Sequence, residues 1–201
     1  YETIRKALDT TLDLFPQRAT VACQGVEGAY SQIACDSIFK DPTILYFNTF
    51  EHVFKAVESG MCQYGVLPIE NSTAGSVNAI YDLMTKHNFS IVRSARLKVS
   101  HNLLCKHGVK KEDIKEIFSH QQAISQCAGY LSTLKGVKVT VVENTALAAQ
   151  MVAQSERRDV AALSSRFCGE LYGLNLLEQN VQDQDNNYTR FICISKNPEI
   201  Y

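Results

Sequence analysis

Short apolar runs rich in β-branched residues alternate with segments of helical periodicity along this chain, and this alternation constrains the fold most strongly. Phe50, Val53, Phe54 and Val57 follow the spacing i, i+3, i+4, i+7, which places them on one helix face. Such alternation predicts an α/β fold with mostly parallel sheets flanked by helices. The predicted strands are residues 19–24, 43–47, 64–67, 116–119, 137–142 and 159–163, and further helices are expected at 30–39, 77–84 and 124–131.

A weak internal repeat suggests that the chain contains two similar lobes. Asn48 opens a helix that is followed by a strand, and Asn144 does the same 96 residues later. The same offset relates Leu67 to Leu163. We interpret this as two α/β lobes, the second starting near residue 100. The alternative is coincidence between two βαβ segments of common length.

The segments between these elements predict how the chain divides. Residues 89–105 alternate well enough to form an extended crossing between lobes, and the apolar strand 190–195 needs a sheet to join. We therefore expect lobe 1 to be discontinuous, and a cleft between two such lobes is a default site for a small molecule. The expected division is a helical lead-in or linker at 1–18, lobe 1 at 19–99 plus 178–201, and lobe 2 at 100–177.

Charge and hydropathy exclude several classes of protein. The formal net charge is −1 with no basic block, so the electrostatic footprint of a nucleic-acid binder is missing. No apolar run approaches the roughly 18 residues that a membrane span needs. The first 18 residues carry charges throughout and contain no apolar core of a secretory signal.

The cysteines and histidines point to a reduced protein without a structural metal. Seven cysteines are present, an odd number, and no two form a CxxC motif. Most stand in apolar runs, which favours buried thiols over disulfides. The five histidines share no metal-ligand spacing with acids or cysteines. We therefore expect a cytoplasmic location and no bound metal.

Residues 66–77, Val-Leu-Pro-Ile-Glu-Asn-Ser-Thr-Ala-Gly-Ser-Val, form the first candidate site segment. A strand is predicted to end in small polar residues, after which a helix starts. Backbone N–H groups at such a helix start can bind a carboxylate or a phosphate. The alternative is that Ser72, Thr73 or Ser76 is simply an N-cap.

Residues 118–127, Phe-Ser-His-Gln-Gln-Ala-Ile-Ser-Gln-Cys, form another strand end that leads into a helix. Ser119 and Gln126 are about two helical turns apart, and Gln126 lies near the apolar face, where a polar group needs a partner. His120 could act as a base, but a histidine at a helix start more often has a structural role.

Residues 182–191, Gln-Asp-Gln-Asp-Asn-Asn-Tyr-Thr-Arg-Phe, change abruptly from a polar run to an apolar strand. Arg190 is flanked by residues expected to be buried, and a buried guanidinium needs an anion. No acid stands at an obvious paired position, so a substrate carboxylate is a plausible partner. The alternative is a solvated loop. No Ser/His/Asp triad, Walker loop or complete dinucleotide fingerprint is present.

Taken together, these segments resemble the prephenate dehydratase family. GVLPIENSTAGSV is similar to its Pro-Ile-Glu-Asn signature, SHQQAISQC to its second signature, and NYTRF to its Thr-Arg-Phe hallmark. CQGVEGAYSQIA, NTALAA, AALSS and LYGL follow the family's order. The match covers about residues 19–195, although Gln121 stands where the family usually has proline. The resemblance implies two lobes of the type II periplasmic-binding-protein fold with the active site in the interlobe cleft.

The resemblance implies decarboxylation and dehydration of prephenate to phenylpyruvate, in phenylalanine biosynthesis. Aromatisation drives this reaction, so no cofactor is expected. Thr189 would hydrogen-bond or protonate the departing hydroxyl, and Asn71, Ser119 and Gln126 would polarise it. Arg190 would hold the side-chain carboxylate. The further substrate-binding residues implied are Glu70, Ser72, Thr73, Asn144, Thr145 and Phe191.

The resemblance also implies partners and alternatives. Relatives act as dimers, often continue into a phenylalanine-binding ACT domain, and in some cases carry a fused chorismate mutase. We therefore expect a homodimer and allow for such modules in a longer protein. Arogenate dehydratase, which performs the same chemistry on the amino analogue, is the nearer alternative. A non-catalytic two-lobed binding module is the more distant one.

Overall fold

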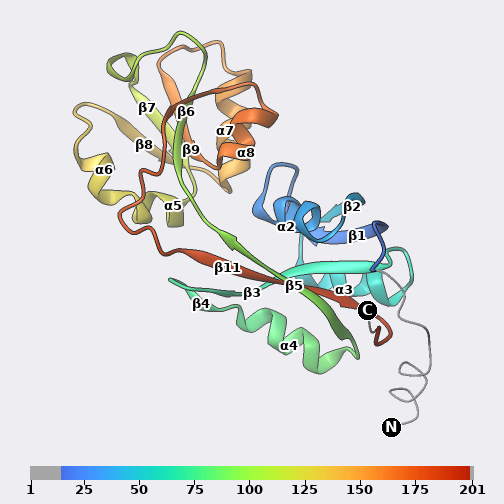
Figure 1. Cartoon of the computed structure of the whole chain (residues 1–201). Coiled ribbons are helices and arrows are strands. Elements are labelled where there is room, and N and C mark those ends of the chain that lie inside the picture. The colour runs from blue at the N-terminus through green and yellow to red at the C-terminus, as the bar shows by residue number, and fades with distance from the viewer. Residues whose placement is uncertain (1–14, 200–201) are drawn as a thin grey trace. The chain divides into compact units, whose positions relative to one another are not determined.

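The computed structural model describes residues 15–199, in which strands and helices alternate as predicted (Figure 1). No helix in this part of the chain is long and apolar enough to cross a bilayer. The expected lead-in helix falls mostly outside the described residues. The elements are β1 (Arg18–Gln24), α2 (Tyr30–Ile38), β2 (Asp41–Phe47), α3 (Phe50–Glu58), β3 (Tyr64–Asn71), β4 (Gly75–Ser76), α4 (Asn78–Lys86), β5 (Ser90–Lys98), β6 (Asn102–Cys105), η1 (Lys111–Asp113), β7 (Glu116–Ser119), α5 (Gln121–Gln126), α6 (Ala128–Ser132), β8 (Lys138–Val141), α7 (Thr145–Gln154), β9 (Val160–Ser164), α8 (Arg166–Leu171), β10 (Asn175–Glu178) and β11 (Tyr188–Ser195).

The chain divides into two compact units. Unit 1 takes the described residues up to Leu97 and those from Tyr188 onward, and unit 2 is Lys98–Asn187. The return to unit 1 comes ten residues later than the expected position 178. The reason is that β10 pairs with β6 of unit 2, and the Val181 N–H then donates to the His101 carbonyl. The expected cleft between the lobes stays a prediction.

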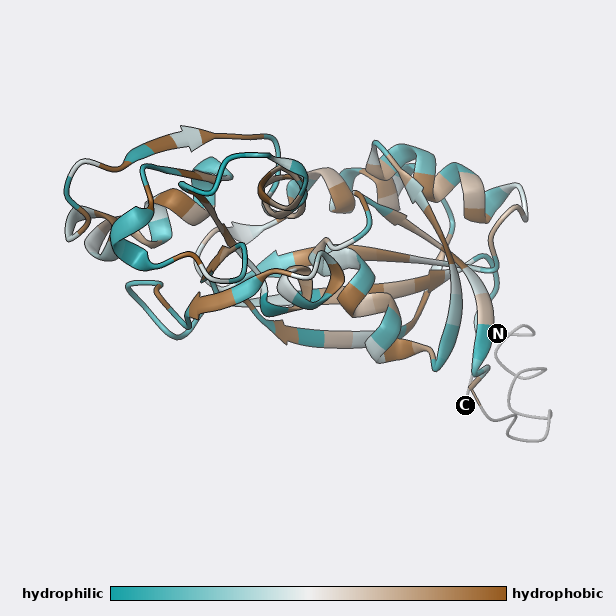
Figure 2. Ribbon diagram, turned by 90° about the horizontal axis from the view of Figure 1, so that it is seen from above, coloured by the Kyte–Doolittle hydropathy of each residue, from teal (hydrophilic) through white to brown (hydrophobic). Residues whose placement is uncertain are grey.

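Unit 1 is built on a sheet with the strand order β2-β1-β3-β11-β5, with β4 added against β3. Strands β1, β2 and β3 are parallel, whereas β11 runs antiparallel to β3. Apolar residues on one side of this sheet pack in a cluster with α2, and those of the other side pack with α3 and α4. In Figure 2 brown, hydrophobic segments occur on both strands and helices, and teal, hydrophilic segments are prominent on the helices.

The sequence dictates how α3 docks on the sheet of unit 1. The Thr49 hydroxyl accepts a hydrogen bond from the His52 N–H and so caps the helix. Val53 and Val57 are buried, and burial stabilises each such side chain by roughly 1.5–3 kcal/mol. A β-carbon at Gly65 would come within 3.0–3.1 Å of Val53, Val57 and Ile194. Glycine at this position therefore allows the helix to lie close to β3.

Unit 2 is built on a second sheet with the order β10-β6-β9-β7-β8. Strands β7, β8 and β9 are parallel, and β6 and β10 join them antiparallel. The parallel strand orders β2-β1-β3 and β8-β7-β9 match in the two units, which confirms two similar α/β lobes. Both sheets are mixed rather than mostly parallel, because segments next to the two crossings add antiparallel strands to them.

The seven cysteines are buried and free, as predicted. Cys23, Cys35 and Cys193 share one core cluster of unit 1. Desolvation raises the pKa of Cys193 to about 12, which keeps this thiol protonated. These residues act as small apolar side chains in the core.

Candidate active site

Thr189 and Asn71 face each other across two antiparallel strands of unit 1. The register of β11 against β3 pairs these two residues directly. The Asn71 side-chain Nδ2 donates a hydrogen bond of 2.9 Å to the Thr189 Oγ1. A donor on the hydroxyl oxygen withdraws electron density from it and makes its proton a better hydrogen-bond donor. Of the expected polarising neighbours of Thr189, the structure places Asn71 in contact with it.

The other end of the Asn71 amide organises the turn after β3. Its Oδ1 accepts hydrogen bonds from the Thr73 N–H, the Thr73 hydroxyl and the Ala74 N–H, at 3.0, 2.8 and 2.9 Å. Gly75 completes the turn with a φ of +81°. The helix predicted at 77–84 is confirmed as α4, which begins at Asn78, but a helix start at Ser72 is wrong because the chain first folds back as β4. Side-chain bonds from Asn71 favour a turn over a helix at this point.

Ser72 is part of the same turn and contacts β11 rather than capping a helix. Its hydroxyl accepts a 2.8 Å hydrogen bond from the Tyr188 N–H, and its own N–H donates to the Tyr188 carbonyl. The turn is thereby tied to the residue that precedes Thr189. Asn71 and Ser72 together fix the backbone and the side chain of the candidate catalytic threonine.

Arg190 lies in a different environment from the one that the sequence suggested. Its side chain is exposed, so the argument from a buried guanidinium is wrong. Glu70 is its partner in the register of β3 and β11, which supplies the acid that was not apparent in the sequence. Neighbouring side chains of a strand point to opposite faces, so Arg190 and Thr189 face opposite sides of β11. Phe191, the next residue, is 3% exposed and packs in the core.

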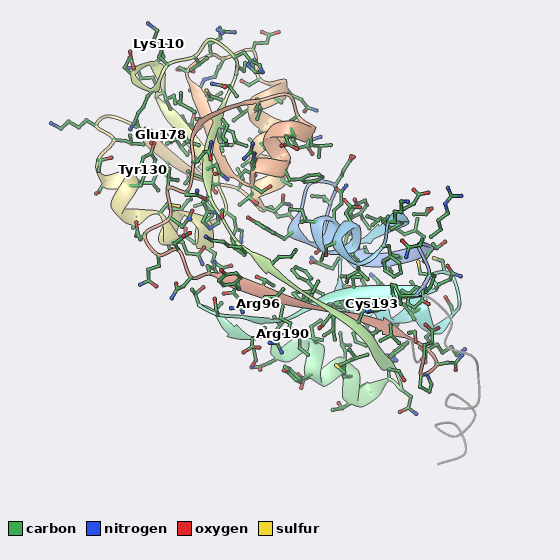
Figure 3. All side chains as sticks on the ribbon, in the orientation of Figure 1. Arg96, Lys110, Tyr130, Glu178, Arg190 and Cys193 are labelled. Carbon is green, nitrogen blue, oxygen red and sulfur yellow. The ribbon has the colours of Figure 1, made fainter. Side chains whose placement is uncertain are left out.

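Arg96 on β5 was not predicted from the sequence and lies beside this part of β11. Its guanidinium carbon is 4.1 Å from the centroid of the Tyr188 ring, a cation–π contact. Tyr188 and Arg190 are two residues apart on one strand and so share a face. Arg96 and Arg190, on neighbouring strands, are both labelled in Figure 3. A polar alternating strand such as 90–98 carries no sequence signal that would single out Arg96.

Ser119 lies at the carboxyl end of β7 in unit 2 and is completely buried. Its hydroxyl donates a 2.9 Å hydrogen bond to the Leu163 carbonyl on the neighbouring β9. The proton of this hydroxyl is therefore engaged within the sheet. With no exposed surface and its proton engaged, Ser119 has a structural function at the carboxyl end of β7.

Gln126 ends α5 and has the partners that its position near an apolar face required. Its Oε1 lies 2.7 Å from the His101 Nε2 and accepts a 3.2 Å hydrogen bond from the Asn187 Nδ2. The two partners are 4% and 5% exposed. His101 was not identified from the sequence, whereas Asn187 stood in the NYTRF segment without an assigned role. The available signal was a polar residue, His101, directly before the apolar strand Asn102–Cys105.

The remaining candidate residues of unit 2 cap helices. The His120 Nδ1 accepts a hydrogen bond from the Gln122 N–H, which supports its structural role as the N-cap of α5. Asn144 caps α7 by accepting a 2.7 Å hydrogen bond from the Leu147 N–H. The Thr145 carbonyl accepts a hydrogen bond from the Ser164 hydroxyl. The N-terminus of α7, with its positive dipole end, is thus held near the end of β9.

Burial determines the charge state of His101. Desolvation lowers the pKa of its imidazole below the ordinary value of 6.5, and the hydrogen bond with Gln126 opposes that shift. Its Nδ1 is buried without a hydrogen-bond partner among the described residues. A proton on Nδ1 would have no acceptor, which agrees with a neutral ring.

Two α/β units of similar topology, each with polar side chains at the carboxyl ends of its parallel strands, define a class of small-molecule-binding proteins and enzymes. The family model for prephenate dehydratase matches residues 21–199. The chain therefore belongs to the prephenate dehydratase family.

Individual proteins agree with this assignment. Arogenate dehydratase/prephenate dehydratase 1, chloroplastic, of Arabidopsis thaliana is 42% identical over 91% of this chain and 46% of its own length. A bifunctional chorismate mutase/prephenate dehydratase of Buchnera aphidicola is 34% identical over 87% of this chain and 46% of its own length. The chain thus spans about half the length of these curated relatives.

Solved structures share the fold. Prephenate dehydratase of Arthrobacter aurescens, crystallised with L-Phe, matches with a TM-score of 0.81 and 25% identity, covering 90% of this chain and 61% of the other. GqqA, described as a novel type of quorum-quenching acylase, matches with a TM-score of 0.79 and 36% identity, covering 89% of this chain and 64% of the other. These matches extend across both units.

Proposed function

We propose that this chain carries the catalytic part of a dehydratase that converts prephenate to phenylpyruvate. The observation that carries the proposal is the hydrogen bond from the Asn71 amide to the Thr189 hydroxyl, in a chain of the prephenate dehydratase family. A hydroxyl that must assist a leaving group needs a donor on its oxygen. Asn71 is in position to be that donor.

The reaction requires the departure of carbon dioxide and of the ring hydroxyl. The electron pair of the breaking carbon–carboxylate bond enters the ring, the ring becomes aromatic, and the opposite carbon–oxygen bond breaks. If Thr189 only donates a hydrogen bond, the departing oxygen leaves as hydroxide; if Thr189 also passes on its proton, the oxygen leaves as water and Thr189 is left as an alkoxide. Any proton passed on is replaced from solvent. Preorganised donors of this kind contribute about 2.7–4 kcal/mol each to lowering a barrier.

The other candidate residues receive binding, hydrogen-bonding or positioning roles. Arg190 points away from Thr189, so we assign it the attraction and binding of a substrate carboxylate and no part in the chemical step. The Gln126 side-chain amide donates to the substrate oxygen on which charge develops, and Ser119 holds the end of β7 in place through its hydrogen bond to the Leu163 carbonyl. The remaining residues proposed to bind substrate are Glu70, Ser72, Thr73, Asn144, Thr145 and Phe191. In three of them the structure supports a positioning role, because Ser72 and Thr73 order the turn and Phe191 packs in the core.

The direct test is to incubate the purified chain with prephenate and to follow phenylpyruvate by its ultraviolet absorbance. We expect phenylpyruvate to form without an added cofactor. A parallel assay with arogenate compares kcat/KM for the two substrates, since the Arabidopsis relative is named for both activities. An acylated quorum-sensing signal is the third compound to assay, because GqqA is described as a quorum-quenching acylase. Hydrolysis of its acyl group with no turnover of prephenate or arogenate would overturn the proposal.

The location and assembly of the protein are further parts of the proposal. Seven buried free cysteines support a reducing compartment, for which we propose the cytoplasm. The plant relative is described as chloroplastic, so cell fractionation tests this point. We also propose a homodimer, which sedimentation analysis checks. The Buchnera relative is described as bifunctional, with a chorismate mutase, so we include an additional module of a longer protein in the proposal.

A further inference from the structure

His101 is a buried histidine beside Gln126, a residue proposed to act on the substrate. What we infer for His101 rests on the proposed function. The main-chain groups of His101 are hydrogen-bonded to the segment after β10. Its carbonyl accepts from the Val181 N–H, and its N–H donates to the Gln182 Oε1 at 2.9 Å. These two bonds fix the backbone that carries the imidazole. Its side chain then contacts Gln126.

The hydrogen bonds around Gln126 define the tautomer of His101. Asn187 donates to the Gln126 Oε1 through its Nδ2, so that oxygen is an acceptor. The His101 Nε2, 2.7 Å from the same oxygen, must therefore carry the proton. The Nδ1 is then the unprotonated nitrogen, and it is the atom buried without a hydrogen-bond partner among the described residues. An unprotonated Nδ1 in this place costs less than a buried N–H donor without an acceptor.

The same bonds define the orientation of the Gln126 amide. Its oxygen is held by two buried donors, His101 and Asn187. The amide nitrogen is attached to the same carbon and points away from both of them. Without these donors the amide could rotate by 180° and exchange its oxygen and nitrogen. Gln126 would then present its oxygen, an acceptor, at the position where its N–H₂ donors had been.

We propose that His101 is a positioning residue, whose Nε2–H holds the Gln126 oxygen so that the Gln126 amide N–H₂ faces the substrate oxygen on which charge develops. His101 itself does not touch the substrate. Its effect on turnover is exerted through Gln126. Asn187 supports the same orientation with a longer hydrogen bond, so His101 contributes the larger share.

The test uses a double-mutant cycle on the whole chain. His101→Leu removes the donor, whereas His101→Gln keeps a donor near the position of Nε2. We expect His101→Leu to lower kcat about tenfold, less than the loss on deleting a donor outright, with KM little changed. We expect His101→Gln to recover most of that loss. In the Gln126→Ala background, His101→Leu should lower kcat no further.

Tyr130→Phe is the matched control. Tyr130 lies in the same unit on α6 (Figure 3), and its hydroxyl is likewise buried. This variant should keep the kcat of the unaltered chain. If the effects of His101→Leu and Gln126→Ala multiplied, or if His101→Gln rescued nothing, the positioning role would be refuted.

A spectroscopic measurement separates this inference from the proposed function. Long-range ¹H–¹⁵N correlation should show His101 as the neutral Nε2–H tautomer, and the Gln126 side-chain amide signals should shift and sharpen in His101→Leu. An Nδ1–H tautomer, or unchanged Gln126 signals, would overturn the inference. If the unaltered chain turned over neither prephenate nor arogenate, the proposed function would fail, and these spectra would still decide whether His101 orients Gln126.

Discussion

The two units hold half-buried candidate side chains through different kinds of partner. In unit 1, Asn71 and Thr189 are half-buried at the ends of two antiparallel strands, where the side chains lie close to a turn. In unit 2, Gln126 is held by His101 and Asn187, which are both buried. In unit 1 a side-chain amide donates to a hydroxyl, whereas in unit 2 two buried donors fix the orientation of an amide. We therefore assign donation to the departing oxygen to Thr189, and orientation of the Gln126 amide to His101 and Asn187.

The largest expected effect comes from removing the hydroxyl on which the proposed chemistry depends. Thr189→Val keeps the shape of the side chain, and we expect kcat to fall by about 10²–10³-fold or more. Binding of a substrate analogue should survive, as measured by calorimetry. Thr20→Val is the matched control, since Thr20 is another half-buried threonine of the same sheet. Normal turnover by Thr189→Val would remove this residue from the chemistry.

Asn71→Asp separates the two functions of the Asn71 side chain. The carboxylate keeps the acceptor that orders the turn with Thr73 and Ala74, but it loses the Nδ2 donor to Thr189. We expect kcat to fall about 10²-fold, while the melting temperature changes little. Asn71→Ala should lower both. Equal melting temperatures for the two variants would contradict the turn-ordering function, and an unchanged kcat for Asn71→Asp would contradict the donor function.

Arg190→Lys tests whether the two faces of β11 have separate tasks. Lysine keeps the charge and loses the planar fork, so we expect KM for prephenate to rise by about tenfold or less, with kcat nearly unchanged. Glu70→Gln removes the acid opposite Arg190 and should change stability by less than about 1 kcal/mol, as for exposed charge pairs. A fall in kcat alone for Arg190→Lys would place Arg190 in the chemical step instead.

The smallest expected effect is on the pH dependence of stability. Burial lowers the pKa of folded His101, so the unfolded chain binds a proton more readily. The neutral ring therefore supports the fold above the unfolded pKa of about 6.5. That support is lost as the pH falls through the lower folded pKa. Urea unfolding between about pH 5 and 8 should show a shallower acidic decline for His101→Gln, and an identical decline would show that His101 does not contribute.

Much of the fold followed from local sequence patterns. The predicted strands appear within a few residues of their expected limits, because β-branched apolar runs between turns have few other ways to bury their side chains. Helix α3 buries the apolar face that its periodicity predicted, because residues spaced three and four apart lie on one side of a helix. The strand predicted at 190–195 is confirmed as β11, which begins two residues earlier at Tyr188 and so includes Thr189. These features depend on residues near one another in the chain.

The features that needed the tertiary structure depend on residues far apart. The partners of Gln126 come from 25 and 61 positions away, and the acid opposite Arg190 is set by the register of two strands. Hydrophobic periodicity shows that a face is buried but does not show which polar atoms meet there. The sequence by itself determined the alternating α/β elements, the two similar units and the family. Only the tertiary structure decided that Asn71 donates to Thr189, that Arg190 is exposed and that His101 holds Gln126, because strand register and side-chain packing bring those atoms together.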